Sequence, residues 1–217
     1  MDEEGRPSGR MLSISQDARP FELFVRDALR LEVDEPTAPP PLDPAAPDHR
    51  DLLTAAERAR AAEQWQAWWR AALAHEARYH GARVTGVPLA WHREQAAERE
   101  AALGSPPDFA ALSGSPELQR ACTLLHPELR SWSRREPPHE SPVTALQSQD
   151  CGDVAAEVAG RWGAELRHVH GVVLAYGVAG PWRRLAAPGV LVSSIVDLET
   201  EPEAVVTEVL ESSVRPA

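Results

Sequence analysis

Residues 62–81 read AEQWQAWWRAALAHEARYHG, and this stretch decides how the middle of the chain folds. Each helical residue advances about 100° around the axis, so the three tryptophans and Tyr79 share one broad face. A helical stripe of large aromatic residues is typical of a buried core face, where each ring removes about 150–250 Å² from water. We therefore expect a long helix whose indole-bearing face packs inward as scaffold and does no chemistry.

The stretch belongs to a helical region over residues 51–136. Thr54 and Glu57 have the spacing of a capping box, which predicts a helix start, and Gly81 is a natural stop. A second helix follows over PLAWHREQAAEREAALG, and we expect the two to form an antiparallel hairpin. SPPDFAAL and SPELQRACTLLHPELRSWSRRE each open with Ser-Pro, which predicts two further helices, the second one kinked or split at Pro127.

The N-terminal part divides into three segments. Residues 1–16 are expected to be a flexible tail, and residues 17–35 contain a short amphipathic helix. Six prolines lie within residues 36–47, so the stretch 36–50 predicts a stiff Pro-rich linker. Because so short a helix is not stable alone, it must dock on its own chain or on a partner.

The pattern changes at residue 150, after a predicted loop at residues 137–149. ELRHVHGVVLAYGV and GVLVSSIVD are rich in Val and typical of strands, AGPWRRLAAP joins them, and helical patterns lie on either side. Residues 150–217 therefore predict a small αββα element, which we expect to share a core with residues 51–136 because two strands alone are marginal. The predicted fold class is α+β: a mainly helical N-terminal and middle region with this small C-terminal αββα element.

Composition excludes several classes of protein. The net charge is -11, all 22 basic residues are arginine, and the chain contains neither Lys nor Asn. An acidic chain lacks the basic face that nucleic acids and anionic membranes need, so neither is an expected partner. Missing lysine excludes a Walker-type phosphate loop and Schiff-base chemistry. The chain has two cysteines, no signal-peptide pattern and no apolar run near the about 20 residues of a membrane span, so we expect a cytoplasmic location.

The motif HEARYH at residues 75–80 is similar to the His-Glu-x-x-His motif of zinc proteases, but its spacing differs. Its histidines are five positions apart, about 140° around the helix, so a straight helix cannot aim both at one ion. Glu76 and His80 share one side, and His92 lies about one turn into the next helix, so these three can converge at one end of the hairpin. Two histidines and a carboxylate are a familiar set for a divalent metal such as zinc. The alternative is a buried or half-buried polar cluster in which Glu76 pairs with an arginine such as Arg83 or Arg93.

The other candidate residues give weaker signals. His168 and His170 lie two positions apart on the first predicted strand, so both imidazoles are expected on one face, but they supply only two metal ligands. The serines of GVLVSSIVD lie in a strand without the strained elbow of a nucleophile. Cys122 lies on an apolar helical stripe, which is typical of an inert buried thiol. Cys151 lies at a helix N-terminus, which lowers the pKa of a thiol, but the charges of the aspartates on either side oppose that effect.

The segment GPWRR places Trp182, Arg183 and Arg184 in the connection between the predicted strands. Trp and Arg are enriched at interface hot spots, which makes these residues the candidate interaction site. The alternative has Trp182 folded back on the sheet and the arginines paired with acids such as Asp197 or Glu199. The sequence therefore favours a non-enzymatic protein that contacts another protein and needs no cofactor. The alternative function is a metal-dependent hydrolase using the hairpin site.

Overall fold

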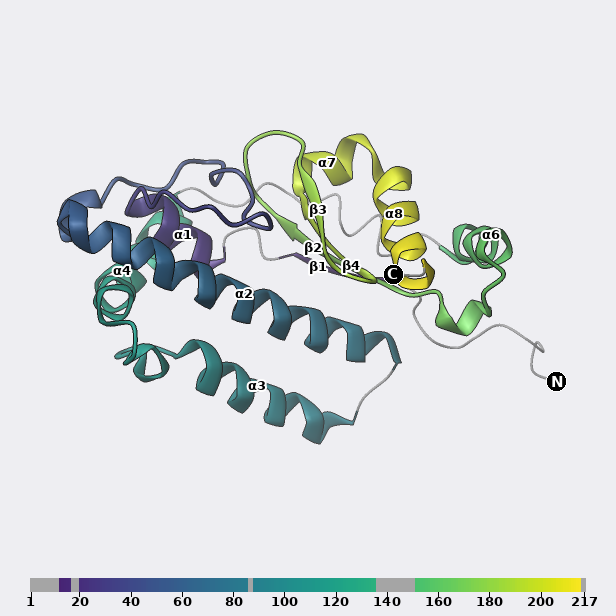
Figure 1. Cartoon of the computed structure of the whole chain (residues 1–217), viewed down its shortest axis with the longest axis horizontal. Coiled ribbons are helices and arrows are strands. Elements are labelled where there is room, and N and C mark those ends of the chain that lie inside the picture. Colours follow the sequence, from purple (N-terminus) through teal and green to yellow (C-terminus); the bar gives the residue numbers. More distant parts are fainter. Residues whose placement is uncertain (1–11, 17–19, 86–87, 136–150, 216–217) are drawn as a thin grey trace.

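The computed structural model describes residues 12–16, 20–85, 88–135 and 151–215. Its centre is a four-stranded mixed sheet with helices on both faces (Figure 1). The strands lie in the order β1 (Leu12–Gln16), β2 (Gly171–Tyr176), β4 (Val190–Ser194) and β3 (Arg183–Ala187). β1, β2 and β4 are parallel, and β3 pairs with β4 in the antiparallel direction at one edge.

The helices form two groups. The N-terminal and middle region contains α1 (Phe21–Ala28), α2 (Ala55–Thr85), α3 (Leu89–Leu103) and α4 (Pro116–Arg135), with 3₁₀ turns at Arg50–Leu52 and Ala110–Leu112. The C-terminal region contains α6 (Gly152–Trp162), a 3₁₀ turn at Leu166–His168, α7 (Ile195–Thr200) and α8 (Pro202–Val214). The fold is α+β, as the sequence predicts.

The sheet separates two hydrophobic cores. Along β2, Val172, Leu174 and Tyr176 belong to the core that contains the tryptophans of α2. Val173 and Ala175 belong to the second core, with residues of α6 and α8. A strand buried on both faces needs apolar residues at every position, which explains the unbroken run GVVLAY.

The indole-bearing face of α2 is buried, as the helical spacing of the tryptophans within residues 62–81 predicts. Trp65, Trp68 and Trp69 are 0%, 4% and 1% exposed. Trp65 stacks on Trp69 with ring centroids 5.5 Å apart, and its Nε1 donates a 2.7 Å hydrogen bond to the Glu22 carbonyl oxygen of α1. The ring of Trp65 therefore fixes α1 against α2.

Several helix boundaries agree with the sequence and others differ. The capping box is present, since Thr54 N donates to Glu57 Oε2 at 2.7 Å and Glu57 N donates to Thr54 Oγ1 at 3.3 Å. α2 and α3 form the predicted hairpin (Figure 1). Gly81 does not end α2, which continues to Thr85, and Pro127 lies inside one continuous helix. SPPDFAAL forms only a 3₁₀ turn.

The Pro-rich stretch is packed against α1 and β2, and this differs from the predicted connector. Arg26 donates to the Pro40 carbonyl oxygen at 2.9 Å, and Leu42 N donates to Asp27 Oδ2 at 2.7 Å. Leu42 also forms a β-bridge with Val178, beyond the end of β2. The amphipathic helix α1 thus docks on its own chain, through buried polar contacts that composition does not reveal.

The sheet is larger than the predicted pair of strands. β1 lies within the predicted tail, of which residues 1–11 are outside the described part of the chain. β3 lies within the predicted connection, and α7 replaces the end of the second predicted strand. The predicted loop 137–149 is outside the described residues. Among the residues that the structure describes, no helix has the length and apolar character needed to cross a bilayer.

Candidate functional site

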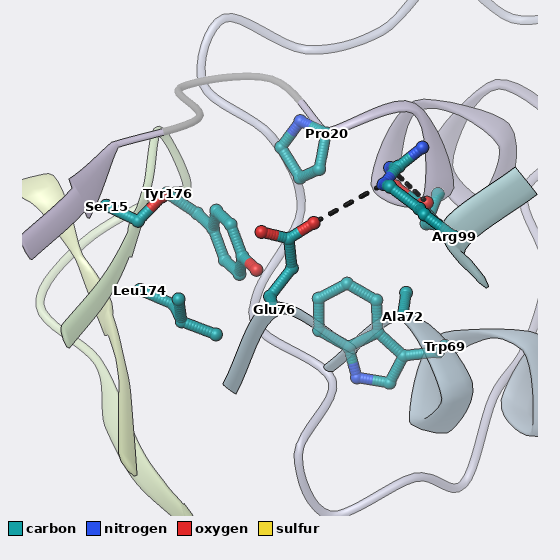
Figure 2. A pocket seen from close by; sticks show the side chains of 9 residues that line it. Ser15, Pro20, Trp69, Ala72, Glu76, Arg99, Leu174 and Tyr176 are labelled. Atoms are coloured by element: carbon teal, nitrogen blue, oxygen red, sulfur yellow. Dashed lines mark hydrogen bonds and ion pairs between the residues drawn. The ribbon is translucent and has the colours of Figure 1, made fainter. Parts of the chain in front are cut away.

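A pocket lies between the sheet and the helical layer, beside the carboxyl ends of the parallel strands β1 and β2 (Figure 2). Its empty space is about 390 Å³, part of which is open to solvent. It is lined by Ser15, Pro20, Glu22, Trp69, Ala72, Glu76, Arg99, Leu174 and Tyr176. The carboxyl ends of parallel strands are where open α/β sheets bind their ligands, so this location makes the pocket a candidate site.

Two carboxylates of the pocket share one guanidinium. Glu76 Oε1 lies 3.4 Å from Arg99 Nε, and Glu22 Oε1 lies 3.5 Å from Arg99 Nη2. The side chain of Glu22 is 6% exposed, whereas that of Arg99 is 45% exposed. Burial opposes the ionisation of Glu76, but the hydrogen bond with His80 and the charge of Arg99 outweigh it and lower the pKa of Glu76. Glu76 is therefore a carboxylate at neutral pH.

Among the described residues, the three predicted metal ligands do not converge on one point. Glu76 Oε2 lies 3.4 Å from His80 Nε2, so these two meet as the sequence suggests. His92 instead contacts the rings of Tyr79 and Trp91, at centroid distances of 5.7 and 5.3 Å. Within the described ranges, no three His, Cys, Asp or Glu side chains are grouped so that they can hold a metal ion. An arginine does lie beside Glu76, as the alternative expects, but it is Arg99 and neither of the two arginines named from the sequence.

Sequence reasoning missed Arg99 and Glu22. Arg99 lies seven residues after His92, two helical turns along the same face of α3, and this spacing is a usable signal. Glu22 has no such signal, because its position depends on how α1 docks against α2. The pocket is thus built by three helices whose mutual packing the sequence pattern does not specify.

Some buried polar atoms of α2 and α3, one of them in a residue that lines the pocket, lack hydrogen bonds with other described residues. These atoms are Trp69 Nε1, His75 Nδ1, His80 Nδ1 and Gln95 Oε1. Burial lowers the pKa of His75, which is 3% exposed, so its imidazole is neutral near pH 7. An unsatisfied buried polar atom costs about 1–3 kcal/mol, so these four atoms lower the stability of the hairpin.

The residues of the predicted interaction site divide into structural and exposed ones. Arg183 is a structural residue and not a free contact: its guanidinium lies 3.0 Å from Asp197, 3.0 Å from Glu201 and 2.8 Å from Glu208. Burial opposes its charge, but these acids outweigh that effect and raise the pKa of Arg183. Trp182 is half-buried against the helical core.

Arg184 and its neighbour Leu185 are exposed on β3, the outermost strand on its side of the sheet. Leu185 is 41% exposed, and Arg184 forms no ion pair with the described residues. Ser194 N donates to the Trp182 carbonyl oxygen at 2.8 Å, so Trp182 directs its backbone polar groups toward β4. These directions alternate along a strand as far as the register shift between Leu185 and Ala187, so Arg183 and Leu185, the last residue before the shift, direct their backbone polar groups away from the sheet.

The imidazoles of His168 and His170 do not share a strand face, because His168 ends a 3₁₀ turn and β2 begins only at Gly171. Nδ1 of His170 lies 3.0 Å from the His168 carbonyl oxygen. Ser194 accepts a hydrogen bond from Asp197 N and caps α7, which is a structural role.

The two thiols differ in burial. Cys122 is fully buried, and burial together with the charge of Glu22 raises the pKa of its thiol well above the usual range. Cys151 is half-buried and caps the N-terminus of α6, as its position in the sequence predicts.

Comparison of the chain with models of protein families, with curated proteins and with solved structures gave no match. Inferences about function therefore depend on the chemistry of the pocket and of the sheet edge.

Proposed function

We propose that the protein works by binding another protein, and that β3 is where the partner attaches. The observation that carries this proposal is the position of β3: it pairs with β4 on one side, and on the other side no strand of the described residues pairs with it. An edge strand presents backbone N–H and C=O groups that a strand from another chain can pair with. On β3 these are the groups of Arg183 and Leu185.

The side chains of β3 define the kind of strand that fits. Trp182 and Ala186 pack on the core that contains α2. Arg184 is two positions from each of them and therefore lies on the same side of the strand. Arg183 reaches α7 and α8 on the other side, where Leu185 also lies. A matching partner strand carries a carboxylate opposite Arg184 and an apolar side chain beside Leu185.

The salt bridges of Arg183 support this proposal because they hold β3 in place before a partner arrives. They join the first residue of the strand to α7 and α8. A preorganised edge loses less conformational entropy on binding than a mobile segment. The chain itself is a poor partner, since pairing two copies of β3 brings two Arg-Arg sequences into one ladder, and like charges across strands are destabilising.

A random peptide library displayed on phage, selected on the purified protein, tests this proposal. Selected peptides are then measured by fluorescence anisotropy against the wild type and against an Arg184→Glu, Leu185→Asp variant. Both residues are exposed, so the variant should keep its circular dichroism spectrum and its unfolding midpoint. We expect its affinity for the peptides to fall at least about tenfold, and we expect N-methylation of alternate peptide residues to abolish binding.

The matched control is Arg93→Glu, which reverses the charge of an exposed arginine on α3. It should bind the selected peptides as the wild type does. Peptides that bind the β3 variant with unchanged affinity, or that tolerate N-methylation at every position, would refute attachment at this edge.

The metal-dependent hydrolase has less support in the geometry. Glu76 already lies against Arg99, whose charge repels a metal ion, and His92 packs among aromatic rings. The proposal of a protein partner also includes a cytoplasmic location, where a thiol such as that of Cys122 stays reduced. The net charge of -11 favours protein partners over nucleic acid.

A further inference from the structure

The outer face of α4 is not covered by the rest of the described chain. α4 packs on α1, α2 and the 3₁₀ turn at Ala110–Leu112, at the end of the helical region away from the sheet (Figure 1). On its outer side, residues recur with the spacing four, three, four, three, which is the spacing of a helix that pairs with another helix. This outer stripe consists of Arg120, Leu124, Pro127, Ser131 and Arg134, all exposed except the half-buried Ser131. Its length is about 21 Å, four helical turns.

The centre of the outer stripe is apolar. Leu124 is 47% exposed, the largest exposed fraction of the large hydrophobic side chains that the structure describes. The other two have local explanations: Leu185 lies on the edge strand β3, and the guanidinium of Arg215 lies 5.4 Å from the ring centroid of Trp162. Pro127 extends the apolar surface of Leu124 by about one helical turn. Apolar residues at these helical positions are the anchors that the apolar face of a second helix contacts.

The charged residues of this face are arginines. Arg130 flanks the outer stripe, and both Arg130 and Arg134 are exposed and form no ion pair with the other described residues. Arg120, at the other end, lies 2.8 Å from Glu57 of α2. The chain as a whole has a net charge of -11, so a face with unpaired arginines is an exception on its surface. Such a face attracts carboxylates, while the negative field of the whole molecule opposes nucleic acid and anionic membranes.

The acidic residues of α4 lie away from the outer stripe. Glu117 lies 2.6 Å from Arg60 of α2 and also accepts a hydrogen bond from Gln64. Glu128 follows Pro127 directly, so it is about 100° further around the helix. The outer stripe therefore has no carboxylate of its own to neutralise its arginines, and a partner with carboxylates complements it.

Pro127 also changes the backbone on this side of α4. The helix continues through Pro127, whose nitrogen has no N–H to donate to the carbonyl oxygen of Thr123, four residues earlier. This carbonyl oxygen therefore lacks its usual helical donor, and Thr123 is exposed. A side-chain hydroxyl or amide of a partner can donate to it, which adds a polar contact beside the apolar centre.

We propose that the outer stripe of α4 binds an acidic amphipathic helix of another protein. The apolar side of that helix covers Leu124 and Pro127, and its carboxylates face Arg130 and Arg134. Two copies of this chain do not pair through the outer stripe, because pairing in either direction brings arginine against arginine. This surface does not include β3, so the proposal can fail while attachment at the sheet edge holds, and the reverse is also true.

Fluorescence anisotropy with a labelled acidic peptide tests the proposal. The probe is a peptide of about 21 residues with Leu at positions a and d of each heptad and Glu at e and g, and its twin has Lys in place of every Glu. The wild type should bind the acidic peptide with saturation, the bound peptide should gain helical circular dichroism, and the twin should not bind. Arg130→Glu combined with Arg134→Glu should weaken binding of the acidic peptide at least about tenfold. Leu124→Gln, which removes apolar contact and keeps a good helix former, should weaken it by about threefold to tenfold.

The matched control is Arg93→Glu combined with Arg184→Glu, which reverses two exposed arginines outside α4 and gives the same net charge. It should bind the acidic peptide as the wild type does. Circular dichroism and urea unfolding establish that each variant is folded before titration. A wild type that does not bind the acidic peptide with saturation, or equal losses of affinity in the control and in the α4 variants, overturns the proposal. Cosedimentation with phosphatidylglycerol vesicles that the α4 variants abolish assigns the outer stripe to an anionic membrane and overturns it as well.

Discussion

Replacing Arg183 by Met should destabilise the fold, whereas the same change at its neighbour Arg184 should not. Arg183→Met keeps most of the aliphatic stem and removes ion pairs with Asp197, Glu201 and Glu208. The acids at 201 and 208 are 58% and 39% exposed, so each pair contributes at most about 1 kcal/mol after solvent screening. Asp197 is 7% exposed, and a buried carboxylate that loses a charged partner costs about 1–3 kcal/mol.

The expected loss is therefore about 2–4 kcal/mol in the free energy of unfolding, measured by urea titration followed by tryptophan fluorescence. Arg184→Met is the control and should change that free energy by no more than about 0.5 kcal/mol, because its side chain is exposed and forms no ion pair with the described residues. Equal free energies for the two variants would show that the Arg183 network does not hold β3 in place.

Three further predictions follow from buried groups. Trp65→Phe loses the hydrogen bond to a carbonyl of α1 and should lower the free energy of unfolding by about 1–3 kcal/mol in urea, whereas an unchanged value would contradict its role. Burial lowers the pKa values of His75 and His126, so the unfolded chain binds protons more tightly and stability declines as pH falls below about 6.5. His75→Gln should reduce that decline in urea midpoints between about pH 7.5 and 5.5, and an identical profile would count against the buried neutral imidazole. Under native conditions a thiol reagent should modify Cys151 quickly and Cys122 only on unfolding, as peptide mass mapping would show; equal rates would contradict the burial of Cys122.

The helical layer could be predicted from the sequence because its signals are local. The tryptophans of α2 repeat with helical spacing, and the capping box at Thr54 and Glu57 lies within four residues. Large rings on one helical face have one stable location, the core. The signals for α3 are equally local: apolar residues repeat with helical spacing, and Gly104 follows the last residue of the helix.

The edges of the sheet could not be predicted in the same way, because their partners are distant in sequence. β1 pairs Leu12 with Gly171, and a five-residue strand with mixed polarity is not distinctive alone. β3 has the sequence RRLAA, in which the usual apolar alternation is missing because an edge strand faces solvent. The Pro-rich stretch is ordered by buried contacts of Arg26 and Asp27, which composition does not show.

The candidate sites were predictable only in part. The spacing of four residues predicts that Glu76 and His80 lie on one side of a helix, and in the structure their side chains meet. Arg99 comes from a different helix and Glu22 from a third, so the pocket depends on tertiary packing. The ion pair of Arg183 with Asp197 is the alternative that the sequence left open, whereas Glu201 and Glu208 lie 18 and 25 positions after Arg183 and meet it only through tertiary packing.

Hydrogen exchange of β3 in the free and the peptide-bound protein is the most direct test of how the protein binds a partner. A peptide selected on the wild type should slow exchange of the outward-facing Arg183 and Leu185 amides and leave those of β2 unchanged. Protection confined to α2 and α3, with β3 exchanging as fast as in the free protein, would contradict attachment at the sheet edge.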